Sequence, residues 1–182
     1  MSEVRRLLPT ESLSKSSFLD FGDVIDMESA DTHYAINDGY ATRFHDLATV
    51  NVGAQGGRPI ISIFKTLPRI FPMQLRVMER HPLGSQAFMP MGDNHFLVVV
   101  AAPTPILDLK TIRCFLAKPG QGVNFSRGTW HHPLIGLEGS TSYLVVDRGG
   151  SLGDDNLDEI NIMSNEVWIS AAIETPGSRS VF

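Results

Sequence analysis

The stretch TIRCFLAKPGQGVNFSRGTWHHP, residues 111–133, decides the fold. It opens with a short run rich in apolar and β-branched residues, 111–117, and continues into a proline- and glycine-rich cluster at 119–122. Such runs predict strands, and proline and glycine between them predict tight turns. The stretch therefore predicts a strand, a turn and a second extended segment.

The same pattern recurs on both sides of this stretch. Further short runs of strand character cover residues 60–64, 73–80, 95–101 and 142–146, and turn clusters separate them. Because no long helical stretch lies between these runs, the chain is predicted to be all-β, an antiparallel barrel or sandwich. A short peripheral helix is expected to begin after Thr10 as its cap and to end before Gly22. Residues 164–173 are predicted to form a final strand or a helix.

Bulk composition sets the class of protein. The chain has 182 residues, 42% of them hydrophobic and 19% charged, so we expect a single domain over residues 1–182, with an N-terminal segment at 1–20 and a loose tail from about residue 174 to residue 182. A net charge of −5 argues against a nucleic-acid partner. The longest apolar run, 96–102, is too short to cross a membrane, and no apolar segment follows the basic residues at the N-terminus, so a cytoplasmic location is expected. Cys114 is the only cysteine and has no internal disulfide partner.

The segment at residues 75–86 carries the first candidate chemistry. On one strand, side chains alternate between faces, so Leu75, Val77, Glu79 and His81 are predicted to share one face. This order suggests a barrel interior that becomes polar towards its mouth. The alternative is that Glu79 and His81 face solvent while the apolar pair covers an edge.

The second candidate is the pair His131 and His132, which strand alternation places on opposite faces. At most one of them is therefore expected to enter a given pocket. A neutral imidazole can bind a metal or carry a proton. The alternative is a structural histidine whose ring is bonded to a backbone carbonyl.

These two segments resemble the two sequence motifs of the cupin superfamily. The second motif is matched by Gly120, Gly128 and His131, with Ser126 where proline is usual; the first is matched by Glu79, His81, Gln86 and Gly92, although histidine and glutamate are usual at the first and third of these positions. The resemblance implies a cupin-type β-barrel. It does not carry over the usual metal ligands as a set.

The amino-acid sequence more specifically resembles the ureidoglycolate lyase family. The strings that carry the resemblance are FGDVI (21–25), INDG (36–39), RFHDL (43–47), ERHPLGSQAFMP (79–90), GQGVN (120–124), RGTWHHP (127–133) and VVDRG (145–149). The resemblance implies a lyase that cleaves (S)-ureidoglycolate to glyoxylate and urea in allantoin and purine degradation, with possible stimulation by Ni²⁺ or another divalent metal. Lys65, where arginine is expected, and Ser126, where histidine is frequent, depart from the family.

The reaction that the family implies assigns the candidate residues. Splitting this hemiaminal needs a base for the hydroxyl proton, an acid for the departing nitrogen and a group that holds the carboxylate. His131 and His81 are the candidates for proton transfer, with Glu79 as orienting group or base. The substrate-binding candidates are Lys65, Arg76 and Arg127 for the carboxylate, with Arg76 disfavoured by alternation, and Gln86 and Asn124 for the ureido group. If a metal binds, the ligands would be Glu79, His81, Gln86 and His131, a set that suits nickel, manganese or iron.

Two other functions stay open from the sequence. One is a hydrolase of the same pathway that attacks the ureido carbonyl and releases ammonia. The other is a non-catalytic cupin that binds a small carboxylate. A homodimer is expected in each case, because exposed sheet edges favour pairing.

Overall fold

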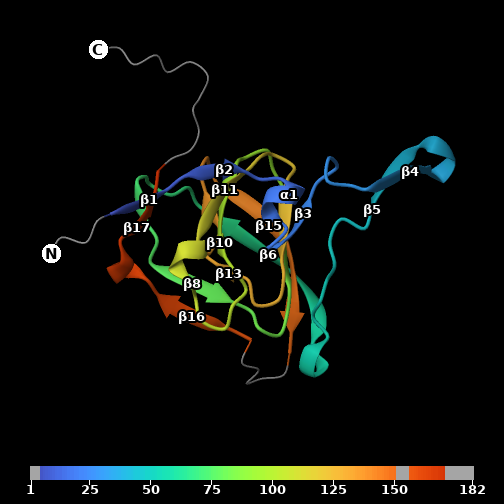
Figure 1. Cartoon of the computed structure of the whole chain (residues 1–182). Coiled ribbons are helices and arrows are strands. Elements are labelled where there is room, and N and C mark those ends of the chain that lie inside the picture. Colours follow the sequence, from blue (N-terminus) through green and yellow to red (C-terminus); the bar gives the residue numbers. More distant parts are fainter. Residues whose placement is uncertain (1–4, 151–155, 171–182) are drawn as a thin grey trace, which may run out of the picture.

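Two β-sheets face each other (Figure 1), and a cluster of buried apolar side chains lies between them. The computed structural model describes residues 5–150 and 156–170. The larger sheet has seven strands in the order β16-β8-β13-β10-β11-β2, with β14 beside β10. Its strands are β2 (Thr10–Ser12), β8 (Val77–Arg80), β10 (Phe96–Ala101), β11 (Arg113–Ala117), β13 (Trp130–His131), β14 (Ile135–Gly136) and β16 (Asp158–Asn161).

The second sheet has five strands in the order β3-β12-β9-β15-β6. They are β3 (Gly22–Ile25), β6 (Arg58–Thr66), β9 (Gln86–Pro90), β12 (Gly122–Phe125) and β15 (Thr141–Gly149). A small sheet combines β1 (Arg6–Leu8), β17 (Val167–Ile169) and β7 (Met73–Gln74). Among the described residues, the helical elements are α1 (Lys15–Phe18) and four short 3₁₀ turns at Asn37–Gly39, Ala54–Gly56, Leu109–Thr111 and Met163–Asn165.

Strand β10 lies at the centre of the packing, because both of its faces are covered. Phe96, Val98 and Val100 point into the layer between the two large sheets. Leu97 and Val99 point to the opposite side, into a second apolar cluster that includes residues of β1 and β17. This is why residues 96–101 form an uninterrupted apolar run instead of alternating with polar residues.

Strands β4 (Thr32–Ile36) and β5 (Ala41–His45) form a hairpin that stands away from the barrel in Figure 1. These two strands pair with each other and with no other strand among the described residues. Tyr40, at the tip, has 93% of its surface exposed. We refer to residues 32–45 as the hairpin arm.

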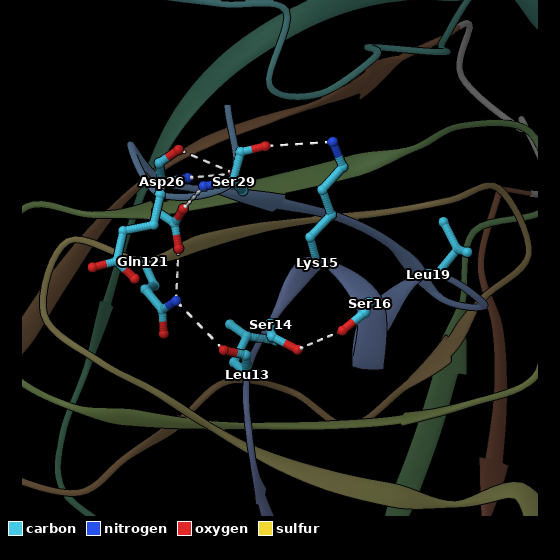
Figure 2. A pocket seen from close by; sticks show the side chains of 9 residues that line it. Leu13, Ser14, Lys15, Ser16, Leu19, Asp26, Ser29 and Gln121 are labelled. Atoms are coloured by element: carbon cyan, nitrogen blue, oxygen red, sulfur yellow. Dashed lines mark hydrogen bonds between the residues drawn. The ribbon is translucent and has the colours of Figure 1, made fainter. Parts of the chain in front are cut away.

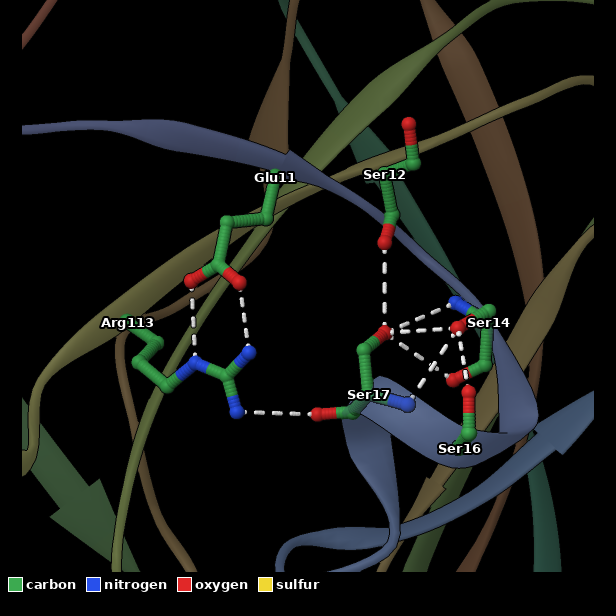
Figure 3. A network of polar contacts seen from close by, with 6 residues as sticks. All are labelled: Glu11, Ser12, Ser14, Ser16, Ser17 and Arg113. Atoms are coloured by element: carbon green, nitrogen blue, oxygen red, sulfur yellow. Dashed lines mark hydrogen bonds and ion pairs between the residues drawn. The ribbon is translucent and has the colours of Figure 1, made fainter.

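The all-β fold class that the sequence predicts is confirmed, but two local predictions are wrong. Thr10 begins strand β2 instead of capping a helix. The cap of α1 is Ser14, four residues later, whose side chain accepts a bond from the Ser17 amide at 3.2 Å (Figure 3). The strand predicted at 73–80 is interrupted at Leu75 and Arg76. Arg113 of β11 forms a bidentate ion pair with Glu11 of β2, at 2.9 and 2.5 Å (Figure 3). Its guanidinium also donates to the Ser17 carbonyl at 3.0 Å, which ties α1 to the same sheet.

The end of the described chain is extended. The prediction of a strand or a helix at 164–173 resolves into a 3₁₀ turn followed by β17, while residues 171–173 and the tail predicted at 174–182 lie outside the described residues. Within residues 5–150 and 156–170, no helix is long and apolar enough to cross a membrane.

Candidate functional site

Glu79, His81 and His131 meet at one end of the layer between the two sheets. Glu79 and His131 are directly opposite each other on β8 and β13, so their side chains project to the same face. One ligand-type atom from each of the three residues lies within 4.8 Å of the other two. The sequence places the first two residues on a common face, and the fold adds the third from a strand about fifty residues further along.

The turn that precedes His131 aims it into this layer. Gly128 has a φ of 78°, a conformation that glycine adopts without a steric penalty. Its amide bonds the His81 carbonyl at 3.0 Å, which ties the turn to the end of β8. The His131 ring then stacks on Phe125, with centroids 4.4 Å apart and an angle of 26° between the planes, and only 2% of its side chain is exposed.

Both histidine rings of the cluster are oriented by backbone carbonyls. The Nδ1 atom of His81 lies 2.7 Å from the Asn156 carbonyl oxygen, and that of His131 lies 3.0 Å from the Thr129 carbonyl oxygen. A carbonyl only accepts, so in the neutral rings Nδ1 carries the hydrogen and Nε2 keeps its lone pair. Metal-binding histidines and histidine bases are held in this way.

The Nε2 atoms of both rings are buried and have no hydrogen-bond partner among the described residues. That of His131 faces Glu79 Oε1 at 3.4 Å. A lone pair opposite a carboxylate oxygen is repulsive, so the arrangement suits a cation between the two atoms. The ring centroids of His81 and His131 are 5.3 Å apart, close enough for one small ligand to touch both.

The charges of the cluster shift its protonation. Burial alone would raise the pKa of Glu79, but the imidazoles of His131 and His81 beside its carboxylate outweigh burial and hold that pKa below its usual value of 4.5. Burial and the neighbouring His131 lower the pKa of His81 from 6.5. At neutral pH the cluster therefore presents a carboxylate and a neutral His81 imidazole.

Gln86 joins the cluster from the opposite sheet. On β9, residues 86, 88 and 90 share one face, and Phe88 of that face lies in the apolar layer. Gln86 is opposite Phe125, the residue on which His131 stacks. Its Oε1 is buried without a hydrogen-bond partner among the described residues. Three of the four predicted ligands, Glu79, His81 and His131, thus lie together, and Gln86 is on the strand beside the Phe125 on which His131 stacks. The role of Gln86 stays a prediction.

Other predicted site residues lie elsewhere. Lys65 is exposed and pairs with Ser142 near the start of β15. Val146, which pairs with Ala87 next to Gln86, is four positions further along that strand, or about 13 Å away at the usual rise of a strand. Asn124 faces away from Val123 and Phe125 of the core, and its amide donates to Asp23 and to the Thr49 carbonyl at 2.9 and 3.1 Å.

The predicted arginines differ in position. Arg76 is exposed in a groove that His132 and Arg69 also line. Arg127 lies at the rim beside the cluster, where its guanidinium donates to the carbonyl of Pro82, the residue after His81, at 3.0 and 3.2 Å. Of the three predicted carboxylate anchors, only Arg127 is thus adjacent to the histidine cluster.

The face predicted for residues 75–81 needs one correction. Leu75 packs with Met78 in the second apolar cluster, on the side of β8 opposite Glu79. The cause is the interruption between β7 and β8, which shifts the alternation by one position. The prediction that His131 and His132 face opposite ways agrees with the structure, since His132 lines the groove with Arg76 and contacts the Pro133 carbonyl at 2.7 Å.

Asp147 is a residue near this end of the barrel that the sequence analysis does not single out. Neighbours on a strand face opposite ways, and the Arg148 guanidinium donates outward to the Ala54 carbonyl at 2.8 and 3.2 Å. Tyr143 and Val145, two and four positions before Asp147, lie in the apolar layer. This alternation was the available signal.

A pocket between α1 and β3 differs from the histidine cluster in how its polar groups are bonded (Figure 2). Gln121 spans it and donates to Asp26 Oδ2 at 2.6 Å and to the Leu13 carbonyl at 3.5 Å. Lys15 bonds the Ser29 carbonyl at 3.4 Å across the other side. Its polar groups are thus bonded to each other, unlike the unpartnered atoms of the histidine cluster.

The structure is an all-β barrel whose two motif segments bring histidines and a carboxylate together inside one end, the arrangement that the resemblance to cupins implies. The family profile described as ureidoglycolate lyase matches residues 5–170. The chain belongs to the ureidoglycolate lyase family.

Curated relatives support this assignment across most of the chain. A ureidoglycolate lyase of Burkholderia cepacia is 46% identical over 154 residues, covering 85% of each chain. One of Azotobacter vinelandii is 45% identical over 146 residues, 80% of this chain and 87% of the relative. One of Pseudomonas fluorescens is 46% identical over 168 residues, 91% of this chain and 98% of the relative. Among solved structures, RmlC from Streptococcus suis in complex with dTDP-D-xylose has a TM-score of 0.44 at 8% identity, covering 80% of this chain and 75% of that chain.

Proposed function

We propose that this chain cleaves the carbon–nitrogen bond of ureidoglycolate and releases glyoxylate and urea. The family to which the chain belongs and the curated ureidoglycolate lyases that are 45–46% identical to it support the reaction. The observation that carries it on the structural side is the convergence of Glu79, His81 and His131 inside the barrel, with acceptor atoms left free. The substrate is a small hemiaminal whose hydroxyl and carboxylate need such a polar end in an otherwise apolar interior.

The direct test is to incubate the purified protein with ureidoglycolate and to follow glyoxylate, urea and ammonia in parallel. Urea and glyoxylate in equal amounts are expected, without ammonia. Ammonia as the nitrogen product would replace the lyase with a hydrolase, and tight glyoxylate binding without turnover would identify a non-catalytic binder.

We also propose that Glu79, His81, Gln86 and His131 hold a divalent cation. The donor set supports this: both Nε2 lone pairs, Glu79 Oε1 and Gln86 Oε1 are acceptors, and three of the four are buried without partners among the described residues. Nitrogen and oxygen donors of this kind suit nickel, manganese or iron. A bound cation would polarise the substrate hydroxyl as a Lewis acid.

Cation binding can be measured apart from turnover. After dialysis against a chelator, titration calorimetry with Ni²⁺ and Mn²⁺ should detect a site, and Glu79→Gln should weaken it by at least ~10-fold, since even groups that only support ligands matter that much. His132→Ala is the matched control and should bind as the unmodified chain does. Equal cation affinities of Glu79→Gln and the unmodified chain would contradict the proposed cation site.

A homodimer is proposed from two exposed features. Strand β6 is the edge of its sheet, and Ile61 and Ile63 on its outer face are 74% and 64% exposed. The hairpin arm lacks a third strand among the described residues, and an isolated hairpin is only marginally stable in water. Light scattering should give twice the chain mass, and Ile63→Lys should lower it; a monomer at micromolar concentration would contradict the proposal.

The cytoplasm is the proposed location. The single cysteine, Cys114, is buried and free, as expected for a protein that needs no disulfide. Cell fractionation should recover the protein with cytoplasmic markers, and recovery with exported proteins would contradict this.

A further inference from the structure

Asp147 is a half-buried carboxylate at the polar end of the barrel. It lies near the end of β15, where Tyr143 and Val145 of the same alternating face point into the apolar layer. Its Oδ1 is buried and has no hydrogen-bond partner among the described residues. Burying an unsatisfied carboxylate oxygen is costly, so a group of this kind calls for a functional reason.

The sheet register brings Asp147 to Gln86. Strands β15 and β9 pair Val145 with Phe88 and Val146 with Ala87. The next position of the same register sets Asp147 beside Gln86, whose own Oε1 is also buried and unpartnered among the described residues. Two buried, unpartnered oxygens thus lie on adjacent strands, on the alternating faces whose other members, Phe88 and Val145, pack in the layer between the sheets.

Asp147 is close to the histidine cluster but not part of it. Its negative charge acts on His81, where it opposes the effect of burial. The group whose ligand atoms all lie within 4.8 Å of one another contains Glu79, His81 and His131 and does not contain Asp147. The carboxylate thus faces the cluster from the other sheet, at a position suited to contact a ligand that the cluster holds.

We propose that Asp147 is the catalytic base that takes the hydroxyl proton of ureidoglycolate. The inference rests on the proposed lyase reaction and names a group for it that no sequence motif of the cupins supplies. It also assigns different roles to the two sides of the site: the histidine cluster binds the ligand, and Asp147 transfers the proton.

The step is balanced without another reactant. A carboxylate oxygen of Asp147 accepts the proton of the hydroxyl on the central carbon, and the oxygen lone pair forms the aldehyde C=O of glyoxylate. The carbon–nitrogen bond breaks and its electron pair goes to the urea nitrogen. That nitrogen takes the proton from Asp147, which returns to the carboxylate.

The first test compares Asp147→Asn with the unmodified chain. The variant keeps the shape and removes the base, so kcat should fall by at least ~10²-fold, the usual share of general base catalysis. Glyoxylate binding and Ni²⁺ affinity should stay unchanged. Glu159→Gln is the matched control, because Glu159 of β16 is an exposed carboxylate, paired with Glu79 of β8. The kcat of this variant should equal that of the unmodified chain.

A second variant guards against a folding defect. Asp147→Glu keeps the charge and displaces the carboxylate by one methylene, so kcat should fall while KM changes little. In Asp147→Ala, added formate should restore part of the lost rate, which a purely structural role would not predict.

The outcomes separate this inference from the proposed function. If the unmodified chain releases no urea, the lyase proposal fails. If it releases urea and folded Asp147→Asn is equally fast, only the role of Asp147 fails. Loss of Ni²⁺ affinity in Asp147→Asn would make Asp147 a ligand and would also overturn its role as base.

Discussion

Replacing His131 by phenylalanine should abolish most of the activity and leave the fold intact. The ring of His131 stacks on Phe125 at 4.4 Å, and a phenyl ring of similar shape keeps this contact. Such aromatic pairs contribute about 0.5–1.5 kcal/mol beyond their burial. Loss of the bond from Nδ1 to the Thr129 carbonyl removes about 1 kcal/mol. The added apolar burial offsets part of this loss, so the free energy of unfolding should change by about 1 kcal/mol.

The effect on catalysis should be much larger. Phenylalanine has no Nε2, the atom that faces Glu79 at 3.4 Å. We expect kcat/KM to fall by at least ~10²-fold, which corresponds to about 2.7 kcal/mol of transition-state stabilisation. His131→Ala should lose the same activity and more stability, because truncation of a buried ring also leaves a cavity.

The neighbouring histidine supplies the control. His132 faces the opposite side and lines a surface groove, so His132→Ala should keep nearly all of the activity. The assay is urea release from ureidoglycolate, with thermal unfolding measured on the same samples. A tenfold loss of kcat/KM corresponds to about half of the expected 2.7 kcal/mol. Folded His131→Phe that retains more than about a tenth of kcat/KM would therefore refute the placement of His131 in the active site.

Three further outcomes follow from the site and the core. Arg127→Ala should raise KM with a smaller effect on kcat, because Arg127 is the predicted carboxylate anchor beside His81; unchanged KM would exclude it. The acid limb of kcat/KM should lie below pH 6.5, since burial lowers the pKa of His81, and a limb above pH 7 would contradict this. The free energy of unfolding should also decrease as the pH falls below 6.5, because the unfolded state then binds more protons. Burial raises the pKa of Cys114 to about 11, so a thiol reagent should modify it only after unfolding, and rapid reaction of the native protein would show otherwise.

The sequence predicted the all-β fold because its signals are local. Runs such as residues 95–101 and the proline–glycine clusters specify strands and turns without reference to distant residues. Glu79 and His81 were placed together for the same reason, since alternation on one strand is enough. The pairing of either residue with His131 depended on the cupin resemblance, because strand order cannot be read from spacing.

What could not be predicted depends on register between distant strands. Asp147 stands beside Gln86 only because β15 and β9 align Val145 with Phe88, and no local pattern fixes that alignment. Lys65 and Asn124 were plausible by side-chain chemistry, but position along a ladder and choice of face put them elsewhere. The start of α1 was misplaced because Thr10 and Ser14 are both good caps, and pairing with β11 draws Thr10 into a strand.

The backbone carbonyls that orient His81 and His131 have an evolutionary consequence. A side-chain partner can be lost by a single mutation, but the carbonyl oxygens of Thr129 and Asn156 persist whichever residues occupy those positions. The rings can therefore keep their aim while the residues around them drift. This gives a physical reason why a lineage could accept Ser126, and glutamine at position 86, without losing the geometry of its two imidazoles.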